Sequence, residues 1–173
     1  MSFALPVSTV GEVNKYLQEY RKKYFDARHV CWAFMLGAAR TTFRTNDDGE
    51  PSSTAGRPIL GQINSHVLTD ILIIVVRYFG GIELGTGGLI VAYRKAAAEA
   101  IAKAEIEERT IDEIITIVFE YPSLNTVMRT IKEEHAEIVS KTIEMTCLMT
   151  LRIQRKFSER LKNRLKIEKI QIK

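Results

Sequence analysis

Cysteine is scarce in this sequence, and no apolar run is long enough to cross a membrane. The two cysteines, Cys31 and Cys147, lie far apart and form no Cys-x-x-Cys pair. We therefore expect two buried, reduced thiols and neither a disulfide nor a metal site. The longest apolar stretch, around Ile71–Val76, is far shorter than the ~20 residues that span a bilayer. The first residues, MSFALPVST, lack the regions of a signal peptide, so these absences together predict a cytoplasmic protein.

The sequence also lacks the motifs of several enzyme classes. It contains neither the Gly-x-x-x-x-Gly-Lys-Ser/Thr motif of nucleotide triphosphatases nor the Gly-x-Ser-x-Gly motif of serine hydrolases. Ser52, Ser53 and Thr54 have no identifiable base nearby, and the three histidines share no ligand spacing. We expect no catalytic residue, no cofactor and no resident metal, which makes an enzyme the less favoured hypothesis.

Apolar residues are present in sufficient number to form real cores. Of the 173 residues, 46% are hydrophobic and 27% are charged, as in soluble globular proteins. A chain of this length can form one large domain or two small ones. The net charge is +4, but residues 152–173 alone contain nine basic and two acidic side chains. That segment therefore carries +7 and the remaining chain −3, which is the clearest charge feature of the sequence.

One apolar strand with a loop on each side dominates the middle of the chain. The run Asp70–Tyr78 has almost no polar residue, as expected for a strand buried on both faces. Before it lies the acid loop, Asp47–Arg57, and after it the glycine loop, Gly80–Gly88, with five glycines in nine residues. Glycine permits positive φ and close backbone approach, so the glycine loop should have a fixed shape. We expect the two loops to be neighbours and to form a recognition site made of Asp48, Glu50, Arg57, Arg77, Gly80, Gly81, Gly85, Thr86, Gly87 and Gly88.

The carboxylates of the acid loop allow two interpretations. Asp47, Asp48 and Glu50 could bind a metal or serve as paired carboxylates in acid–base chemistry. The favoured interpretation is structural, with the acids shaping the turn and forming ion pairs with Arg57 or Arg77. In that case the arginines tie the two loops together.

The glycine loop also allows two interpretations. Backbone N–H groups ahead of the next helix, together with the helix dipole, can hold an anion. Alternatively, the glycines only let strand and helix pack closely, and this interpretation is favoured. Lysine is absent from the loop, which argues against a nucleotide triphosphatase.

The last helical pattern is amphipathic and basic. It contains an apolar stripe at helical spacing, formed by Phe157, Leu161 and Leu165. Its cations form either an ordinary solvated face or a non-specific, salt-sensitive surface for RNA phosphates. The candidate nucleic-acid-binding residues are Arg155, Lys156, Arg160, Lys162, Arg164 and Lys166. Base stacking could come from three aromatic side chains that core packing explains equally well, namely Tyr78, Phe79 and Tyr93.

The periodicity elsewhere predicts alternating strands and helices. In the first part we expect strands at 2–7, 29–36, 40–44 and 70–78, a helix opened by the Thr9–Glu12 capping box, and helices at 53–66, distorted by Pro58, and 86–103. The charged stretch 105–109 suggests a boundary. Beyond it we expect strands at 111–121, 136–144, 146–153 and 167–172, with helices capped by Ser123 and Ser158. This order, β-α-β-β-α-β, is the split βαβ arrangement.

The central stretch resembles the signature of the IMPACT/YigZ family, once catalogued as uncharacterised protein family 0029. The matching segments are Asp48–Ser52, Thr54–Leu60, Arg77–Gly81 and Leu84–Leu89. So many special residues at fixed spacing make the signal specific. The chain departs from the family pattern at three positions that usually hold glycine, lysine and arginine, which here are Ser53, Glu83 and Val91.

The resemblance implies a two-domain α+β protein. Residues 1–108 would form a domain similar to ribosomal protein S5 domain 2 and to domain IV of elongation factor G. Residues 109–173 would form a ferredoxin-like βαββαβ domain similar to domain V of that factor. Family members normally carry further residues ahead of Ser2 that complete the first strand and its neighbour, so an open sheet edge is one expectation here.

The resemblance also implies a role in translation. Eukaryotic members modulate amino-acid-starvation signalling by competing for an activator of the initiation-factor kinase, a role that depends on a further N-terminal domain. Our first hypothesis is a non-enzymatic regulator of translation acting through the ribosome, RNA or a protein partner in translation, without a membrane partner. The alternative is an enzyme or small-molecule binder that uses the acid loop and the glycine loop as one pocket. A scaffold acting through protein partners alone is a third possibility.

Overall fold

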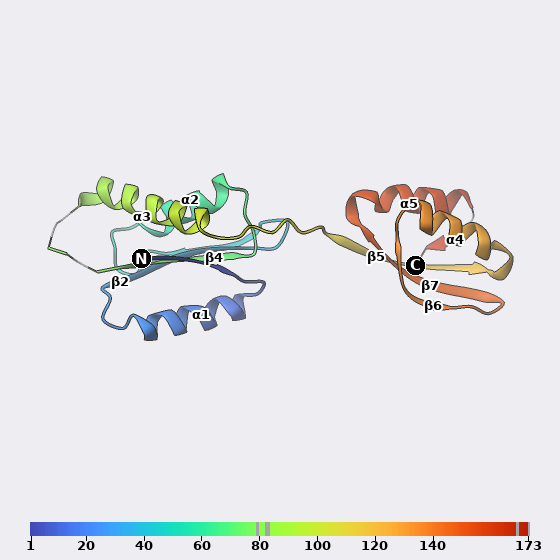
Figure 1. Cartoon of the computed structure of the whole chain (residues 1–173), viewed down its shortest axis with the longest axis horizontal. Helices are drawn as coiled ribbons and strands as arrows, with labels where there is room; N and C mark the ends of the chain where they lie inside the picture. The colour runs from blue at the N-terminus through green and yellow to red at the C-terminus, as the bar shows by residue number, and fades with distance from the viewer. Residues whose placement is uncertain (79, 82–83, 169, 173) are drawn as a thin grey trace. The chain divides into compact units, whose positions relative to one another are not determined.

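The chain folds into two compact units, each built on its own antiparallel sheet (Figure 1). The computed structural model describes residues 1–78, 80–81, 84–168 and 170–172. The first unit spans Met1–Ile106 and the second Glu107–Lys173. Within the described residues, each unit has one four-stranded sheet with helices packed against it. The expected mixed α+β fold is thereby confirmed.

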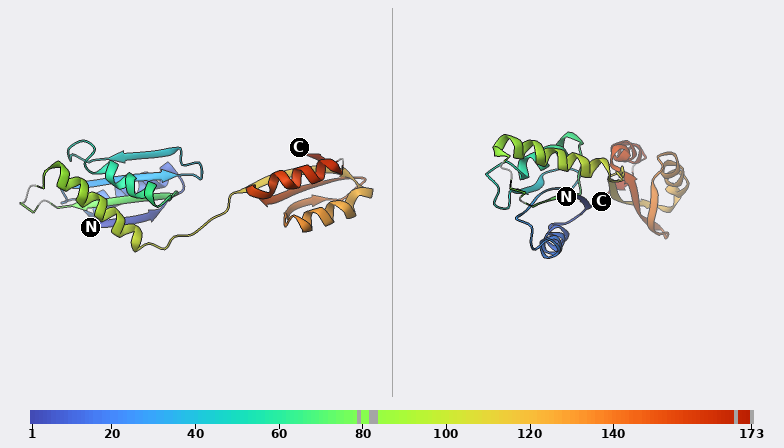
Figure 2. Two further views of the ribbon diagram at one scale, coloured as in Figure 1. Left: turned by 90° about the horizontal axis from the view of Figure 1, so that it is seen from above. Right: turned by 60° about the vertical axis from the view of Figure 1, so that its left-hand side comes forward.

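The first unit has three layers, with a sheet between two layers of helix (Figures 1 and 2). Its strands are β1 (Ser2–Pro6), β2 (His29–Leu36), β3 (Thr42–Asn46) and β4 (Ile71–Arg77). Its helices are α1 (Val10–Lys23), α2 (Gly56–Ser65) and α3 (Gly85–Ala102). The sheet order is β1-β4-β2-β3, with α1 on one face and α2 and α3 on the other.

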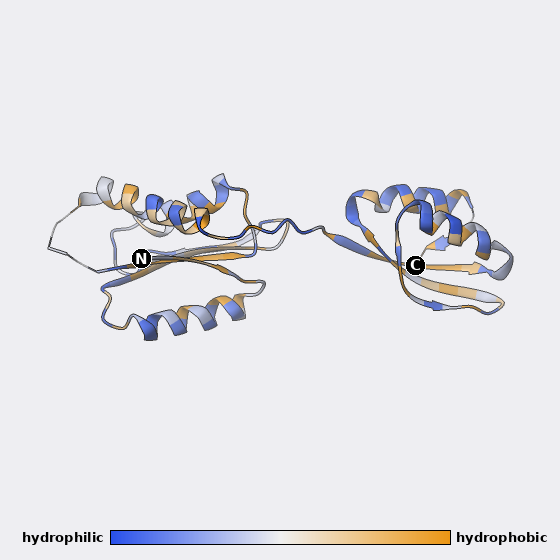
Figure 3. Ribbon diagram, in the orientation of Figure 1, coloured by the Kyte–Doolittle hydropathy of each residue, from blue (hydrophilic) through white to orange (hydrophobic). Residues whose placement is uncertain are grey.

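Strand β4 is buried on both faces, as its sequence predicts. Residues 72–76 are each at most 5% exposed. Leu72, Ile74 and Val76 belong to the core beneath α1, whereas Ile73 and Val75 belong to the core beneath α2 and α3. Figure 3 shows the apolar colouring concentrated along the sheet. One strand therefore serves two cores, because side chains alternate between the faces of a sheet.

The start of α1 is fixed by the predicted capping box. The Thr9 hydroxyl accepts a hydrogen bond from the Glu12 amide at 3.2 Å, and the Glu12 carboxylate accepts one from the Thr9 amide at 3.3 Å. Such a cap stabilises a helix by about 1 kcal/mol. The apolar side of α1 packs on the sheet, where the ring centroids of Phe3 and Tyr20 lie 4.9 Å apart in an edge-to-face pair.

Helix α2 begins later than its sequence predicts. Its first residue is Gly56, and Ser53 lies outside it. Pro58 falls in the first turn, where a helix has no internal acceptor for the missing N–H, so it does not distort the helix interior. A Cβ at Gly56 would lie 2.9 Å from the Asn46 nitrogen. Glycine at this position therefore lets α2 approach the end of β3.

The second unit has two layers. Its elements are β5 (Asp112–Glu120), a short 3-10 turn η1 (Tyr121–Ser123), α4 (Leu124–Glu133), β6 (Glu137–Thr142), β7 (Thr146–Gln154), α5 (Arg155–Ile167) and β8 (Gln171–Ile172). The sheet order is β6-β7-β5-β8, and every pair is antiparallel. Strand β7 therefore lies between β5 and β6. Both helices pack on one face of this sheet around a single core.

Of the two helix starts expected in the second unit, the one after Ser123 is confirmed, since α4 begins at Leu124, whereas the one at Ser158 is wrong. Helix α5 begins at Arg155, directly after β7, and the Arg155 amide, which has no acceptor within the helix, donates to the Ile111 carbonyl at 2.7 Å. Ser158 is buried in α5, and its side chain bonds to Glu113. Ser123 precedes α4 but makes no side-chain cap. In the part of the chain that the structure describes, no helix is long and apolar enough to cross a membrane.

Candidate functional site

The acid loop is held in place by its own first carboxylate. Asp47 Oδ1 accepts hydrogen bonds from the amides of Ala55 at 3.0 Å and Gly56 at 2.7 Å, and its Oδ2 accepts one from Ser53 at 2.9 Å. Ala55, which immediately precedes α2, has no side-chain oxygen to offer. Asp47 therefore satisfies amides that the first turn of a helix leaves without partners.

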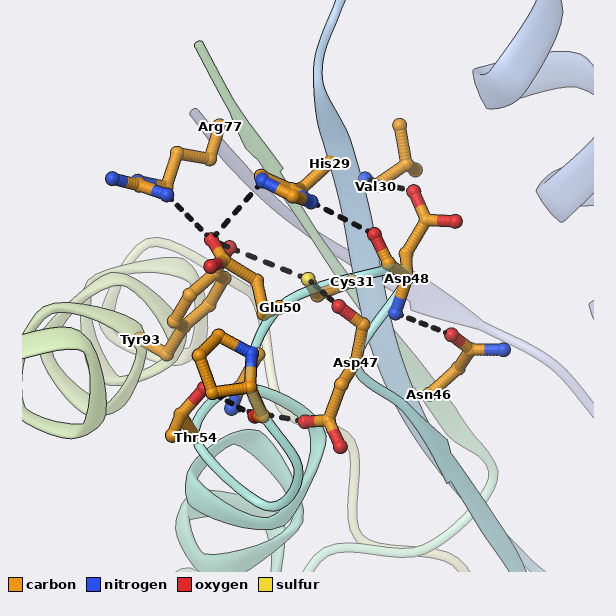
Figure 4. A network of polar contacts seen from close by, with 12 residues as sticks. His29, Val30, Cys31, Asn46, Asp47, Asp48, Glu50, Thr54, Arg77 and Tyr93 are labelled. Carbon is orange, nitrogen blue, oxygen red and sulfur yellow. Dashed lines mark hydrogen bonds and ion pairs between the residues drawn. The ribbon is translucent and has the colours of Figure 1, made fainter. Parts of the chain in front are cut away.

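The second carboxylate of the acid loop points the opposite way (Figure 4). Asp48 Oδ2 accepts from the Val30 amide at 2.6 Å and from Arg21 Nη1 at 2.9 Å. The Asp48 carbonyl lies 2.8 Å from His29 Nδ1. Asp48 and Gly49 both have positive φ, at 42° and 86°, a conformation that glycine and aspartate tolerate best. The loop is thus joined to both β2 and α1.

Glu50 is the buried centre of a polar network (Figure 4). Its side chain is 4% exposed, and its Oε1 accepts from Arg77 Nη1 at 2.7 Å and from the Tyr93 hydroxyl at 2.7 Å. His29 Nε2 lies 3.8 Å from the same oxygen. Arg77 ends β4 and Tyr93 lies in α3. Glu50 therefore connects the acid loop to the two elements that flank the glycine loop.

Cys31 extends this network but is not a reactive thiol. Its Sγ donates toward the Asp47 carbonyl at 3.0 Å and the Tyr93 hydroxyl at 3.3 Å. Burial raises the pKa of the Cys31 thiol to about 12, and burial likewise raises the pKa of the Tyr93 hydroxyl. Nucleophilic cysteines have lowered pKa values, so at neutral pH this thiol is a protonated hydrogen-bond donor.

The two arginines of the predicted recognition site have different surroundings. Arg77 forms the expected ion pair, with Glu50. Arg57 is exposed and makes no ion pair with the described residues, so within them it does not join the acid loop to the glycine loop. The reason is its position as the second residue of α2, on the solvent side, whereas the neighbouring Gly56 and Pro58 are buried.

The glycine loop is open to solvent in its described part. Gly81 and Gly85 have φ of 82° and 65°, which explains glycine at these two positions. A Cβ at Gly80, Gly81, Gly85 or Gly87 would meet no atom within 4 Å, whereas one at Gly88 would lie 3.0 Å from the Leu84 Cβ. Close packing therefore accounts for Gly88 and not for the others. Phe79 and Glu83, singled out from the sequence, lie outside the described residues.

The basic helix α5 has two kinds of cation. Three of the six predicted nucleic-acid-binding residues are held by carboxylates of the same unit. Arg160 and Arg164 both donate to Glu134, and Lys162 Nζ donates to Glu113 at 2.6 Å. The bond from Arg164 holds the pKa of the Glu134 carboxyl below its usual value, as Lys162 does for Glu113. The other three are exposed and form no ion pair within the described part of the chain, namely Arg155, Lys156 and Lys166.

A groove that the sequence did not reveal lies on the α1 side of the first sheet. It is lined by residues of α1 and β2 and by Asp48. The only feature of the sequence that could have indicated this groove is the single tryptophan, Trp32, within a predicted strand. No group of three or more His, Cys, Asp or Glu side chains that could hold a metal ion occurs within residues 1–78, 80–81, 84–168 and 170–172.

Comparison with known proteins finds relatives for most of the chain. Residues 1–101 match the family model described as Impact N-terminal domain. The chain is 38% identical over 127 residues to IMPACT family member YvyE of Bacillus subtilis, a match that covers 73% of this chain and 58% of that protein. It is 30% identical over 166 residues to IMPACT family member YigZ of Escherichia coli, covering 84% of this chain and 81% of that protein. A crystal structure of a hypothetical protein superposes with a TM-score of 0.66 at 27% identity, covering 99% of this chain and 85% of that one.

Proposed function

We propose that this chain, which belongs to the IMPACT family, is a non-enzymatic regulator of translation that associates with RNA or the ribosome. The cytoplasm is the compartment in which it would act, and a protein partner in translation could share the surface. The observation that carries the proposal is a set of three exposed cations on α5, Arg155, Lys156 and Lys166, that form no ion pair within 4 Å among the described residues.

Three cations give α5 a surface suited to phosphates. Arg155 and Lys166 are eleven residues apart in the sequence, which places them on nearly the same side of a helix, because 3.6 residues make one turn. Lys156 Nζ lies 4.8 Å from the centre of the Phe157 ring. Exposed Lys and Arg side chains bind nucleic acid by neutralising phosphates and releasing counterions. The three paired cations of α5 are less available, because an incoming phosphate must compete with Glu113 and Glu134.

The topology of the two units supports the same class of function. The β6-β7-β5-β8 order, with its split βαβ connection, is compatible with a ferredoxin-like domain similar to elongation factor G domain V. For the first unit we propose a likeness to ribosomal protein S5 domain 2, with the domain border near residue 108.

The chemistry of the acid loop favours a structural role over catalysis. Asp47, Asp48 and Glu50 all accept hydrogen bonds from protein donors, and the nearby Cys31 thiol is protonated. These groups therefore brace the fold, and the recognition surface is assigned to the exposed cations.

Ribosome co-sedimentation and RNA binding across a salt series test the proposal. The triple variant Arg155→Ala, Lys156→Ala, Lys166→Ala removes three exposed cations that form no ion pair within 4 Å among the described residues. If each contacts one phosphate, the slope of log K against log salt should fall by about 2, since each phosphate contact to a single strand contributes about 0.7.

A matched control removes three exposed cations from the first unit, Arg94→Ala, Lys95→Ala, Lys103→Ala, with the same change in net charge. It should keep the wild-type slope. No association of the wild type at low salt, or equal loss in both variants, would overturn the proposal.

A further inference from the structure

A groove of about 550 Å³ runs along α1 in the first unit. Its lining combines apolar side chains with polar and charged ones. The lining residues are Leu17, Gln18, Arg21, Lys22, Val30, Trp32 and Asp48. The volume lies within the range of small-ligand sites, about 300–1,000 Å³. The groove shares Asp48 and Val30 with the polar network of Figure 4, whereas Glu50 itself bonds to Tyr93 of α3, on the other side of the sheet.

The floor of the groove offers an aromatic platform. Trp32 is half-buried, and its ring is stacked on Phe34 with centroids 5.9 Å apart and planes 14° apart. Both side chains point to the α1 face, since they belong to the same core. Aromatic rings exposed in a groove of this kind are the usual stacking surfaces for bases of single-stranded nucleic acid.

The rim of the groove is positively charged. Arg21 and Lys22 come from α1, and both are exposed. Strand pairing places Arg44 of β3 opposite Phe34, on the same face of the sheet, and Arg44 is exposed as well. The carboxylate of Asp48 is paired with Arg21 at 2.9 Å. Lys22 therefore gives the lining a net positive charge, and Arg44, which lies outside the lining, adds a second cation on the face of the sheet that carries Trp32.

We propose that this groove binds single-stranded RNA, with one base stacked on Trp32 and its flanking phosphates on Lys22 and Arg44. The charge of the rim and the aromatic floor match the two chemical parts of a nucleotide chain. The choice of RNA as the polymer rests on the proposed function, whereas the position of the site rests on the groove alone.

Intrinsic fluorescence reports on this site directly, because Trp32 is the only tryptophan in the chain. Titration with oligouridylate at low salt should quench the emission, since stacking brings a base against the indole. Trp32→Leu should weaken binding of a labelled oligouridylate by roughly tenfold, from the stacking contribution of one base, whereas Trp32→Phe should retain most of the affinity. Far-UV circular dichroism of Trp32→Leu shows whether the leucine variant itself still folds.

The rim is tested separately through salt dependence. Lys22→Ala and Arg44→Ala should each lower the slope of log K against log salt by about 0.7, and Lys95→Ala on α3 should not. RNA that binds without changing Trp32 emission would overturn this site and leave the α5 surface intact as the proposed function. Absence of all RNA binding would overturn both, and equal quenching by single-stranded DNA would overturn the assignment to RNA.

Discussion

Replacing Glu50 with alanine should destabilise the first unit strongly. The carboxylate is 4% exposed and accepts from Arg77 and Tyr93, each at 2.7 Å. Removing one member of a buried charged pair costs about 3–5 kcal/mol. Arg77 keeps 19% of its side chain exposed, so water partly compensates and the loss should lie near about 3 kcal/mol.

Urea unfolding followed by Trp32 fluorescence measures this loss, because the only tryptophan lies on β2 of the first unit. For a unit of about 100 residues, a loss of that size corresponds to a fall in Tm of roughly 12–24 °C. Glu50→Gln should give an intermediate effect, since its amide oxygen can still accept from Tyr93 without the charge that Arg77 pairs with.

The control is Asp26→Ala, which removes the exposed hydrogen bond from the Tyr78 hydroxyl. It should leave the urea midpoint unchanged, because water replaces a partner lost at the surface. If Glu50→Ala unfolds at the same urea concentration as Asp26→Ala, the Glu50 network does not hold the acid loop to β4 and α3.

Other contacts give three further expected outcomes. Gly56→Ala should lower the free energy of unfolding by about 1–3 kcal/mol because a Cβ does not fit, and Gly61→Ala in the same helix, where a Cβ meets nothing, should raise it by about 0.5–1 kcal/mol; urea midpoints compare them. The first unit should lose stability as pH rises from 9.0 toward about 12, because the pKa of Cys31 is raised over that range on folding, and Cys31→Ala should reduce that slope by up to about 1.4 kcal/mol per pH unit. The second unit should lose stability as pH falls below 4.5, because folding lowers the pKa of Glu134 from that value, and Glu134→Gln should flatten this acid limb in far-UV circular dichroism. Equal urea midpoints for Gly56→Ala and Gly61→Ala would contradict the close approach at Gly56. An unchanged pH dependence of stability in Cys31→Ala or Glu134→Gln would contradict the role given to that side chain.

The features that sequence alone predicted are those that depend on neighbouring residues. The sequence of β4 predicts burial on both faces because the side chains that point to either face are apolar, so neither face could be exposed to solvent. The Thr9–Glu12 capping box lies within one helical turn, so the three-residue spacing in the sequence is enough to predict both of its hydrogen bonds. The family pattern was equally local, and the match over residues 1–101 confirms it.

The features that sequence missed depend on partners from elsewhere in the fold. The start of α2 is fixed by the carboxylate of Asp47, which lies nine residues before Gly56. The cations of α5 appeared equivalent, but packing of α4 beside α5 brings Glu134 to Arg160 and Arg164. The groove at Trp32 depends on the packing of α1 against β2 and on the position of Asp48, which the spacing of residues along the chain does not give.

The double burial of β4 has a consequence for how the first unit opens. Because one strand supplies apolar side chains to both cores, neither helical layer can separate without exposing apolar side chains of the strand on which the other layer also packs. Backbone amides of β4 should therefore exchange with deuterium only through unfolding of the whole unit. An occupant of the groove under α1 would slow that exchange on both sides of the sheet, including at α3.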